Sequence, residues 1–200
     1  MLNSCFMTGV IEAGCDEAGR GCLAGPVFAA AVIFPGDFNH PLLNDSKKMS
    51  SLQREKAADI IKKTALSYAL GQADVKEIDR LNILKASIIA MHRALDQLSI
   101  FPEHIIVDGN RFTPYRHIKH QCIVKGDGKY TSIAAASILA KTERDSYMNL
   151  LHRQFPLYGW NRNKGYPTEA HRKAINDYGI SPYHRRTFRL YNEQIRIPDF

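Results

Sequence analysis

The sequence predicts an α/β protein with a helical C-terminal portion. Short apolar runs bounded by Gly or Pro, longer segments with helical spacing between them, and helical segments at the C-terminal end support this class. A chain of 200 residues, 44% of them hydrophobic, can bury a full core without disulfides or a structural metal. We expect a main domain over residues 1–155 and an extension over residues 156–200 that packs on the same unit.

The expected strands are short apolar runs that end at turn residues. In chain order they cover residues 9–15, 27–34, 66–73, 104–107 and 121–124. The second run, VFAAAVIF, is apolar at every position, which favours a strand buried on both faces.

The expected helices combine apolar residues at helical spacing with end signals. They cover residues 51–64, 82–98, 133–155 and 168–178. Ser50 or Ser51 caps the first helix, Pro156 stops the third, and the fourth runs from a Thr168 cap to Gly179.

The charge of the chain points weakly to a polyanionic partner. The formal net charge is +7, and residues 141–200 carry 11 Lys and Arg against 6 Asp and Glu. Nucleic acid or an anionic membrane surface would suit this basic segment, although a solvated surface explains the charge equally well. No stretch is long and apolar enough for a membrane span, and no secretory signal precedes the first strand.

The cysteines are expected to be free thiols in a reducing compartment, which indicates a cytoplasmic protein. They form no CxxC pair and no zinc-ligand spacing, and they stand at Cys5, Cys15, Cys22 and Cys122.

Carboxylates recur where an apolar strand meets a Gly-containing turn. The three positions are Asp16-Glu17, Asp108-Gly109 and Gly126-Asp127-Gly128. In an open α/β sheet such positions meet in the crevice at the strand ends, where they repel one another unless a cation neutralises them. Oxygen ligands without His or Cys suit Mg²⁺ or Mn²⁺. Any one Asp is more simply a turn residue, but three in the same pattern favour a metal site.

Basic and Gly-rich loops accompany these carboxylates. They are Gly19-Arg20-Gly21, Asp45-Ser46-Lys47-Lys48, Asn163-Lys164-Gly165-Tyr166-Pro167 and His184-Arg185-Arg186. Each loop alone is a weak signal. An acidic metal crevice beside phosphate-binding cations is what phosphodiester chemistry needs.

Eight ordered motifs make the chain resemble bacterial ribonuclease HII, the type 2 ribonuclease H, from about residue 9 to residue 188. They read DEAGRGCLAGPV, LNDSKKMS, EIDRLNILKAS, VDGNR, VKGD, SIAAASILAKTERD, NKGYPT and SPYHRRTF. The resemblance implies an RNase H-like mixed sheet flanked by helices, with the catalytic domain in residues 1–155 and a helical C-terminal extension. It also implies a metal-dependent endonuclease that cleaves the RNA strand of RNA–DNA hybrids and incises 5′ to a single ribonucleotide in duplex DNA.

The resemblance assigns roles to residues at the matching positions. The metal ligands would be Asp16, Glu17, Asp108 and Asp127, which we interpret as holding two ions that share Asp16 and the scissile phosphate. Substrate contacts would come from Gly19, Arg20 and Gly21 at the ribose 2′-hydroxyl, Tyr166 on the sugar beside the junction, and Lys47 and Lys141 at phosphates. Cys22 departs from the family's usual proline, and Gly128-Lys129-Tyr130 departs from its usual serine-containing stretch.

Two other functions are weighed against this one. A non-catalytic nucleic-acid-binding module has no need of four carboxylates at strand ends. Another RNase H-fold nuclease, such as a transposase or resolvase, would share the acidic site but not both the Gly-Arg-Gly and Lys-Gly-Tyr motifs. We expect a monomer, and the sequence leaves contact with a replication clamp open.

Several conspicuous residues receive structural interpretations. We expect Asp145 to form an ion pair rather than bind metal, and Trp160 to pack in the core rather than stack on a base. We expect His171 and His184 to lie at the surface or against the backbone rather than bind metal. Arg185 and Arg186 contact DNA phosphates or tie the C-terminal segment to the core, with equal weight. Residues 192–200 are expected to be a frayed terminus, with a partner-binding peptide as the alternative.

Overall fold

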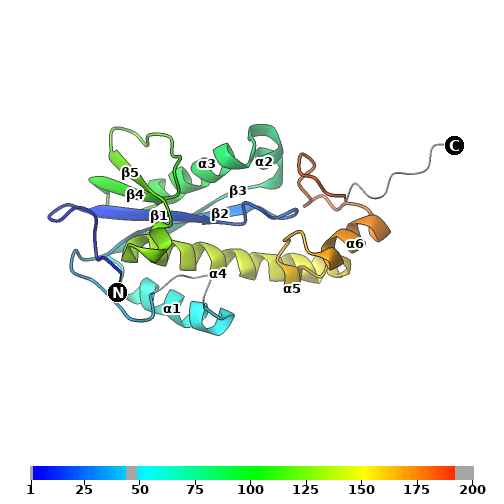
Figure 1. Ribbon diagram of the computed structural model, residues 1–200, viewed down its shortest axis with the longest axis horizontal. Coiled ribbons are helices and arrows are strands. Elements are labelled where there is room, and N and C mark those ends of the chain that lie inside the picture. The colour runs from blue at the N-terminus through cyan, green and yellow to red at the C-terminus, as the bar shows by residue number, and fades with distance from the viewer. Residues whose placement is uncertain (1, 44–48, 192–200) are drawn as a thin grey trace.

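A five-stranded mixed sheet forms the centre of the molecule in the computed structural model, which describes residues 2–43 and 49–191 (Figure 1). The strands are β1 (Glu12–Ala18), β2 (Val27–Ile33), β3 (Ser67–Ala73), β4 (His104–Asp108) and β5 (Lys119–Ile123). Their spatial order is β3-β2-β1-β4-β5. β2 is antiparallel to both β1 and β3, whereas β1, β4 and β5 run parallel. The predicted fold class is confirmed.

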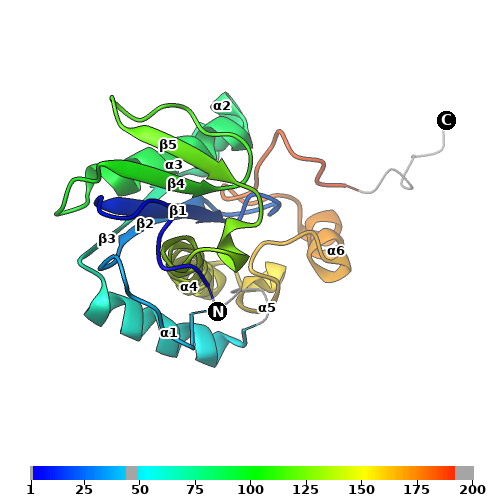
Figure 2. The same ribbon diagram turned by 60° about the vertical axis from the view of Figure 1, so that its left-hand side comes forward.

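Helices cover both faces of this sheet (Figures 1 and 2). One face carries α2 (Val75–Leu81) and α3 (Ile83–Asp96), and the other carries α1 (Ser51–Thr64) and α4 (Thr131–Gln154). β2 is buried at every position because it lies between the two layers, as its apolar run predicts. Side chains alternate along β1, so Ala13 and Cys15 join the core under α3 while Ala18 joins the core under α4.

The start of α1 shows how a few residues determine where a helix begins. The Ser50 hydroxyl accepts the N–H of Gln53, and the Gln53 side chain accepts the N–H of Ser50 in return. This capping box confirms the predicted start of the helix. A capping box formed by Asp74 and Glu77 also starts α2. The sequence does not predict this helix, because seven residues are too few to show helical periodicity.

β1 extends further than predicted. The strand expected to stop at Cys15 continues to Ala18, because its antiparallel pairing with β2 persists as far as Ala18 opposite Phe28. Asp16 and Glu17 therefore lie inside the strand rather than after it. Their side chains point to opposite faces of the sheet.

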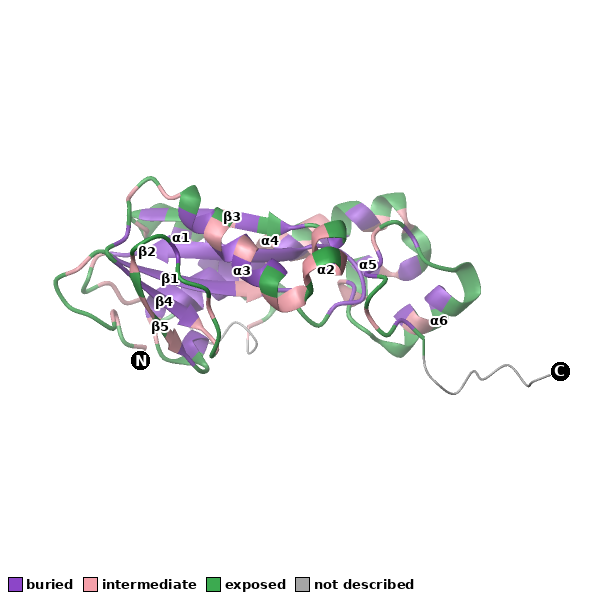
Figure 3. Ribbon diagram, turned by 90° about the horizontal axis from the view of Figure 1, so that it is seen from above, coloured by how far each residue is buried: buried purple, intermediate pink, exposed green. Residues whose placement is uncertain are grey.

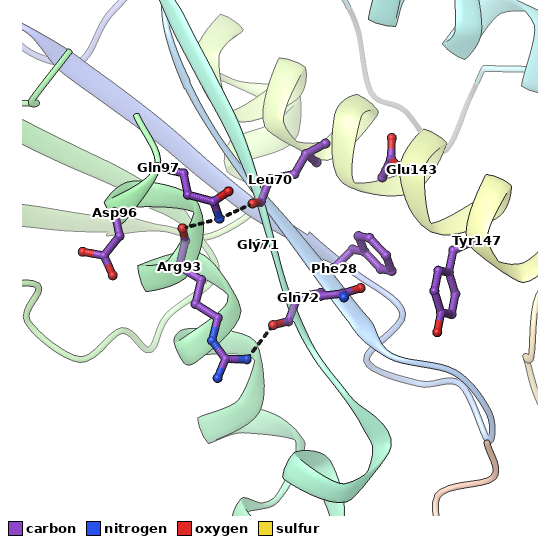
Figure 4. Close-up of a pocket in the computed structure, with 9 residues that line it drawn as sticks. All are labelled: Phe28, Leu70, Gly71, Gln72, Arg93, Asp96, Gln97, Glu143 and Tyr147. Carbon is purple, nitrogen blue, oxygen red and sulfur yellow. Dashed lines mark hydrogen bonds between the residues drawn. The ribbon is translucent and has the colours of Figure 1, made fainter. Parts of the chain in front are cut away.

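The free edge of β3 is covered by side chains of the α3 end. Arg93 Nη1 donates to the carbonyl of Gln72 at 2.7 Å, and Gln97 Nε2 donates to the carbonyl of Leu70 at 2.9 Å (Figure 4). These contacts border a cavity of about 700 Å³. They also occupy carbonyls that an exposed edge strand would offer to another chain.

The C-terminal part is helical, as predicted. It contains a 3-10 turn (Pro156–Tyr158), α5 (Trp160–Asn163) and α6 (Glu169–Tyr178). The buried positions of α6, His171, Ala174 and Ile175, recur at helical spacing, and the rest of the helix is more exposed (Figure 3). Ile175 belongs to one apolar cluster with Trp160, with Met148 of α4 and with Leu23 in the loop after β1. This cluster holds the C-terminal part beside the loop that follows Asp16. Among the described residues, no helix has the length and apolar character to cross a membrane.

Candidate active site

Three parallel strands bring the predicted carboxylates to one edge of the sheet. Asp16 lies near the end of β1, Asp108 is the last residue of β4, and Asp127 lies in the 3-10 turn Gly126–Gly128 that follows β5. The β1–β4 register pairs the residues that immediately precede Asp16 and Asp108. Asp108 is therefore the neighbour of Asp16 across the sheet, as expected for the ends of parallel strands.

Asp16 is buried, with 5% of its surface exposed. Its Oδ1 accepts the backbone N–H of Glu17 at 2.7 Å, and its side chain is hydrogen-bonded to Ser137 of α4. Burial, followed by the negative charges of Glu17 and Asp108, raises the pKa of Asp16 well above its usual value, although these hydrogen bonds oppose the shift. A cation beside Asp16 would relieve both the repulsion and the loss of hydration.

Glu17 and Asp108 line a cavity of about 170 Å³ under α3. Burial raises the pKa of Glu17, while Arg20, whose Nη1 donates to Glu17 Oε1 at 3.0 Å, lowers it. Asp108 Oδ1 accepts the N–H of Gly126 at 2.7 Å. This bond ties the end of β4 to the turn that carries the buried Asp127.

The donor chemistry of this edge fits a hard divalent cation. Within residues 2–43 and 49–191, no three Asp, Glu, His or Cys groups are already assembled as a metal site. The carboxylate oxygens are nonetheless the ligands that Mg²⁺ and Mn²⁺ prefer, and a bound cation would offset the repulsion among Asp16, Glu17 and Asp108. Of the four carboxylates, the structure couples Asp16, Glu17 and Asp108 electrostatically, and it places Asp127 beside Asp108 through Gly126.

The loop after β1 presents exposed backbone. The N–H of Cys22 donates to the carbonyl of Gly19 at 3.4 Å, which leaves Arg20 and Gly21 at the tip of a turn. Gly19 has φ +96°, and a Cβ there would lie 2.0 Å from Arg144 Nε, so the fold itself requires this glycine. A Cβ at Gly21 would meet nothing within 4 Å. The missing side chain at Gly21 therefore leaves the backbone open to a ligand.

Arg144 of α4 links this loop to the Tyr166 segment. Its guanidinium is buried and donates to the carbonyls of Pro26 at 3.1 Å, Ala24 at 3.1 Å and Lys164 at 2.8 Å. One buried side chain therefore holds both loops that the sequence assigns to substrate.

Arg185 strengthens the same loop from the C-terminal side. It is fully buried, and it donates twice to the carbonyl of Gly25, at 2.8 and 3.0 Å, and once to the carbonyl of Arg20 at 2.9 Å. Of the two roles left open by the sequence, Arg185 has the structural one. Arg186 is exposed, and its backbone N–H donates to Asp79 at 3.0 Å.

Tyr166 stands at the surface beside the glycine loop. Its side chain is 45% exposed, and the Arg144 guanidinium lies 5.9 Å from the centre of its ring. A hydrogen bond joins the side chains of Tyr166 and Cys22. Cys22, which replaces the family's usual proline, thus touches the residue expected to stack on the sugar.

The remaining predicted contacts are placed as follows. Lys141 lies one helical turn after Ser137 on α4, which puts it on the face of the helix that turns toward Asp16. Lys47 lies outside the described residues, as do residues 192–200. Among the residues given structural interpretations, Asp145 pairs with Arg54 at 3.2 Å and Trp160 is fully buried, as predicted.

The two histidines lie against the backbone, one of the two placements predicted for them, and both are buried. His171 Nδ1 lies 2.9 Å from the carbonyl oxygen of Tyr166, and the N–H of Ser181 donates to His184 Nδ1 at 2.9 Å. The sequence does not predict Ser137 and Arg144 as supports of the site. Both lie within a long helix, where nothing in the sequence tells which face reaches the site.

Comparison with known proteins shows the family. The family model described as Ribonuclease HII matches residues 13–191. A protein named Ribonuclease HII from Parabacteroides distasonis is 60% identical over 197 residues, with 98% of this chain and 99% of that protein covered.

Solved structures agree with this match. The crystal structure of the ribonuclease H2 from Pyrococcus horikoshii OT3 aligns with a TM-score of 0.73 at 28% identity, over 90% of this chain and 94% of that one. The RNase HII in a PCNA:RNase HII complex from Archaeoglobus fulgidus also aligns with a TM-score of 0.73, at 26% identity, over 92% and 98% of the two chains. With its carboxylates at the strand ends and its whole length matched, the chain belongs to the ribonuclease HII family and is a type 2 ribonuclease H.

Proposed function

We propose that this enzyme hydrolyses the RNA strand of RNA–DNA hybrids and also incises duplex DNA on the 5′ side of a single embedded ribonucleotide. The products would be a 3′-hydroxyl and a 5′-phosphate. The observation that carries this proposal is the arrangement at one sheet edge, where buried Asp16 lies on the strand that leads directly into the open Gly19–Gly21 turn.

Recognition of ribose would use the backbone of this turn. The 2′-hydroxyl is the feature that distinguishes a ribonucleotide from DNA, and it is both a donor and an acceptor. Backbone N–H and C=O groups beside Gly21 can pair with it at close range because no Cβ intervenes. A deoxyribose would leave those groups unpaired, which disfavours the binding of DNA at this position. The exposed ring of Tyr166 would stack on the neighbouring sugar.

Catalysis would use divalent metal held by Asp16, Glu17, Asp108 and Asp127, with Mg²⁺ or Mn²⁺ as the candidates. When bound, two such ions activate water and stabilise the leaving 3′-oxygen of a phosphodiester. The chain's own contribution is to fix the donor oxygens. Ser137 and the N–H of Glu17 orient the Asp16 carboxylate, and Arg20 restrains Glu17. Lys141, on the same face of α4 as Ser137, would contact a phosphate.

We propose a monomer as the active form, because one chain supplies the carboxylates, the glycine turn and Tyr166. A cytoplasmic location is part of the proposal, since the substrate is DNA and the four cysteines are free. The Archaeoglobus complex contains PCNA, but a clamp contact through residues 192–200 of this chain would fall outside the described residues.

A duplex with one ribonucleotide tests the proposal, with an all-DNA duplex of the same sequence as its control. We expect nicking of the ribonucleotide duplex with Mg²⁺ or Mn²⁺, no nicking in a chelator, and no nicking of the control. Asp59→Asn, at an exposed position on α1, should behave as the wild type. Equal nicking of both duplexes, or of neither, would refute the proposal.

A further inference from the structure

A buried chain of hydrogen bonds lies behind Tyr166. Trp160 Nε1 donates to His171 Nε2 at 3.0 Å, and His184 Nε2 lies 3.2 Å from the same nitrogen. His171 Nδ1 lies 2.9 Å from the carbonyl oxygen of Tyr166. The exposed fraction is 0% for Trp160 and His171 and 1% for His184, so water does not compete for these contacts.

The contacts fix where each imidazole carries its proton. The backbone N–H of Ser181 donates to His184 Nδ1 at 2.9 Å, so that nitrogen offers a lone pair and the proton of neutral His184 is on Nε2. That N–H points at His171 Nε2, which also accepts from Trp160. The proton of His171 is therefore on Nδ1 and is donated to Tyr166. Only this pair of neutral tautomers gives each contact a donor and an acceptor. The lone pair of His171 Nε2 is then shared by the N–H groups of Trp160 and His184. The lone pair of His184 Nδ1 is shared by the N–H and the hydroxyl of Ser181, whose Oγ lies at 3.0 Å.

This chain joins the two segments assigned to substrate. His184 forms a β-bridge with Ala24, in the loop that continues from the Gly19–Gly21 turn. On either side of the bridge, Gly25 N–H donates to the carbonyl of Tyr183 at 2.9 Å and Arg185 N–H donates to the carbonyl of Leu23 at 2.9 Å. His184 in turn contacts His171, whose Nδ1 lies against the carbonyl oxygen of Tyr166.

We propose that His171 and His184, with Trp160, are positioning residues for Tyr166: as neutral imidazoles they fix its backbone carbonyl relative to the glycine loop. This proposal rests on the proposed role of Tyr166 at the ribonucleotide junction. It adds a second, buried support to the site, distinct from the metal ligands.

The surroundings keep the pair neutral. Burial lowers the pKa of both rings, and burial together with the neighbouring His171 lowers the pKa of His184 to about 4. The Arg172 cation on α6 lowers the pKa of His171 further, while the carbonyls of Tyr166 and Gly165 act in the opposite direction. The rings of Tyr158 and Trp160 pack against His184 at 4.8 and 5.5 Å between centres. A proton on His184 Nδ1 would face the N–H of Ser181, and one on His171 Nε2 would face the N–H of Trp160.

Two substitutions at His171 separate positioning from packing. His171→Asn keeps a side-chain N–H close to the position of Nδ1 and cannot take up a proton, whereas His171→Leu keeps bulk and loses the donor. We expect His171→Leu to lower single-ribonucleotide incision about 10-fold, and we expect a loss at least as large for Tyr166→Ala. His171→Asn should retain most of the activity. Combining His171→Leu with Tyr166→Ala should cost no more than Tyr166→Ala alone, because His171 would act on incision only through the position of the Tyr166 ring, which the second variant lacks.

The exposed His117 provides the matched control, since His117→Asn should match the wild type in every assay. Additive losses in the double variant, or a His171→Leu enzyme as active as the wild type, would overturn the proposal. If the wild type itself fails to incise the junction, the proposed function fails instead, and the following measurement still decides the state of the pair.

Nitrogen-15 NMR of the imidazoles in the wild-type protein tests the chain without any substrate. We expect an Nδ1–H tautomer for His171 and an Nε2–H tautomer for His184, both neutral at pH 6. This measurement also covers the case in which His171→Leu does not fold. Opposite tautomers, or a ring that is protonated at pH 6, would overturn the proposal.

Discussion

Asp16 meets two conflicting demands in the folded protein. It is buried and repelled by Glu17 and Asp108, yet the proposed chemistry needs it as a charged ligand. Asp16→Asn should therefore abolish cleavage, with a fall of at least about 1,000-fold, and leave hybrid binding intact. Because the amide removes a desolvated and repelled charge, the free energy of unfolding should rise by roughly 1 kcal/mol or hold steady. Filter binding and urea unfolding check the two parts, and retained cleavage would contradict the assigned role.

Gly19 and Gly21 should respond differently to alanine. At Gly19 the positive φ and the clash with Arg144 predict a loss of stability of roughly 2 kcal/mol or more. At Gly21 the added methyl meets open space, so stability should stay within about 0.5 kcal/mol while incision at a ribonucleotide falls about 10-fold or more. Thermal unfolding and incision kinetics on both variants check this contrast. A fully active Gly21→Ala enzyme would argue against backbone reading of the ribose.

His184 makes stability depend on pH. Its pKa falls from the usual 6.5 to about 4 in the folded state, so above pH 6.5 both states are neutral and full stability is present. As the pH falls from 6.5 toward 4, His184 binds a proton in the unfolded chain but not in the folded chain. Stability should then drop by up to about 1.4 kcal/mol per pH unit. Urea unfolding between about pH 5 and pH 7.5 measures this slope, and an equal slope in His184→Asn would contradict the assignment.

At the scale of elements, the apolar runs and helical caps were enough to predict most of the sheet and helices. The apolar run at Val27–Ile33 predicts a buried strand, and Ser50 predicts the start of a helix, each from a few neighbouring residues. The continuation of β1 past Cys15 could not be predicted, because pairing with β2 overrides the polarity of Asp16 and Glu17. The carboxylate positions followed from strand ends and from family motifs, whereas Ser137 of α4 depends on a helix-to-strand contact that no local pattern encodes.

Arg144 illustrates a contact between elements that decides the site. It joins α4 to two loops through three carbonyls, and no lysine can reproduce that geometry. Arg144→Lys should lower the free energy of unfolding by about 2–4 kcal/mol and raise the KM for ribonucleotide-containing DNA. Arg153→Lys, at an exposed position on the same helix, is the control. Urea unfolding and steady-state kinetics check both, and equal stability of the two variants would contradict the assigned contact.

For the whole molecule, the formal charge of +7 takes on a clearer meaning once the acidic groups are located. Carboxylates at the sheet edge would be offset by bound metal, so the face that meets substrate is more positive than the net charge suggests. The basic C-terminal part packs beside that edge through its apolar cluster with α4 and Leu23. The proposed metal ligands, the proposed ribose-binding turn and the basic C-terminal part thus come from a single chain.

In the proposed enzyme, one site couples carboxylate-held metal to recognition of a single 2′-hydroxyl. Mapping the product ends of a duplex with one ribonucleotide, beside the all-DNA duplex, tests this coupling. We predict a single nick 5′ to the ribonucleotide, with 3′-hydroxyl and 5′-phosphate ends, that requires Mg²⁺ or Mn²⁺. A nick on the 3′ side, a cyclic phosphate end or comparable cutting of the all-DNA duplex would contradict it.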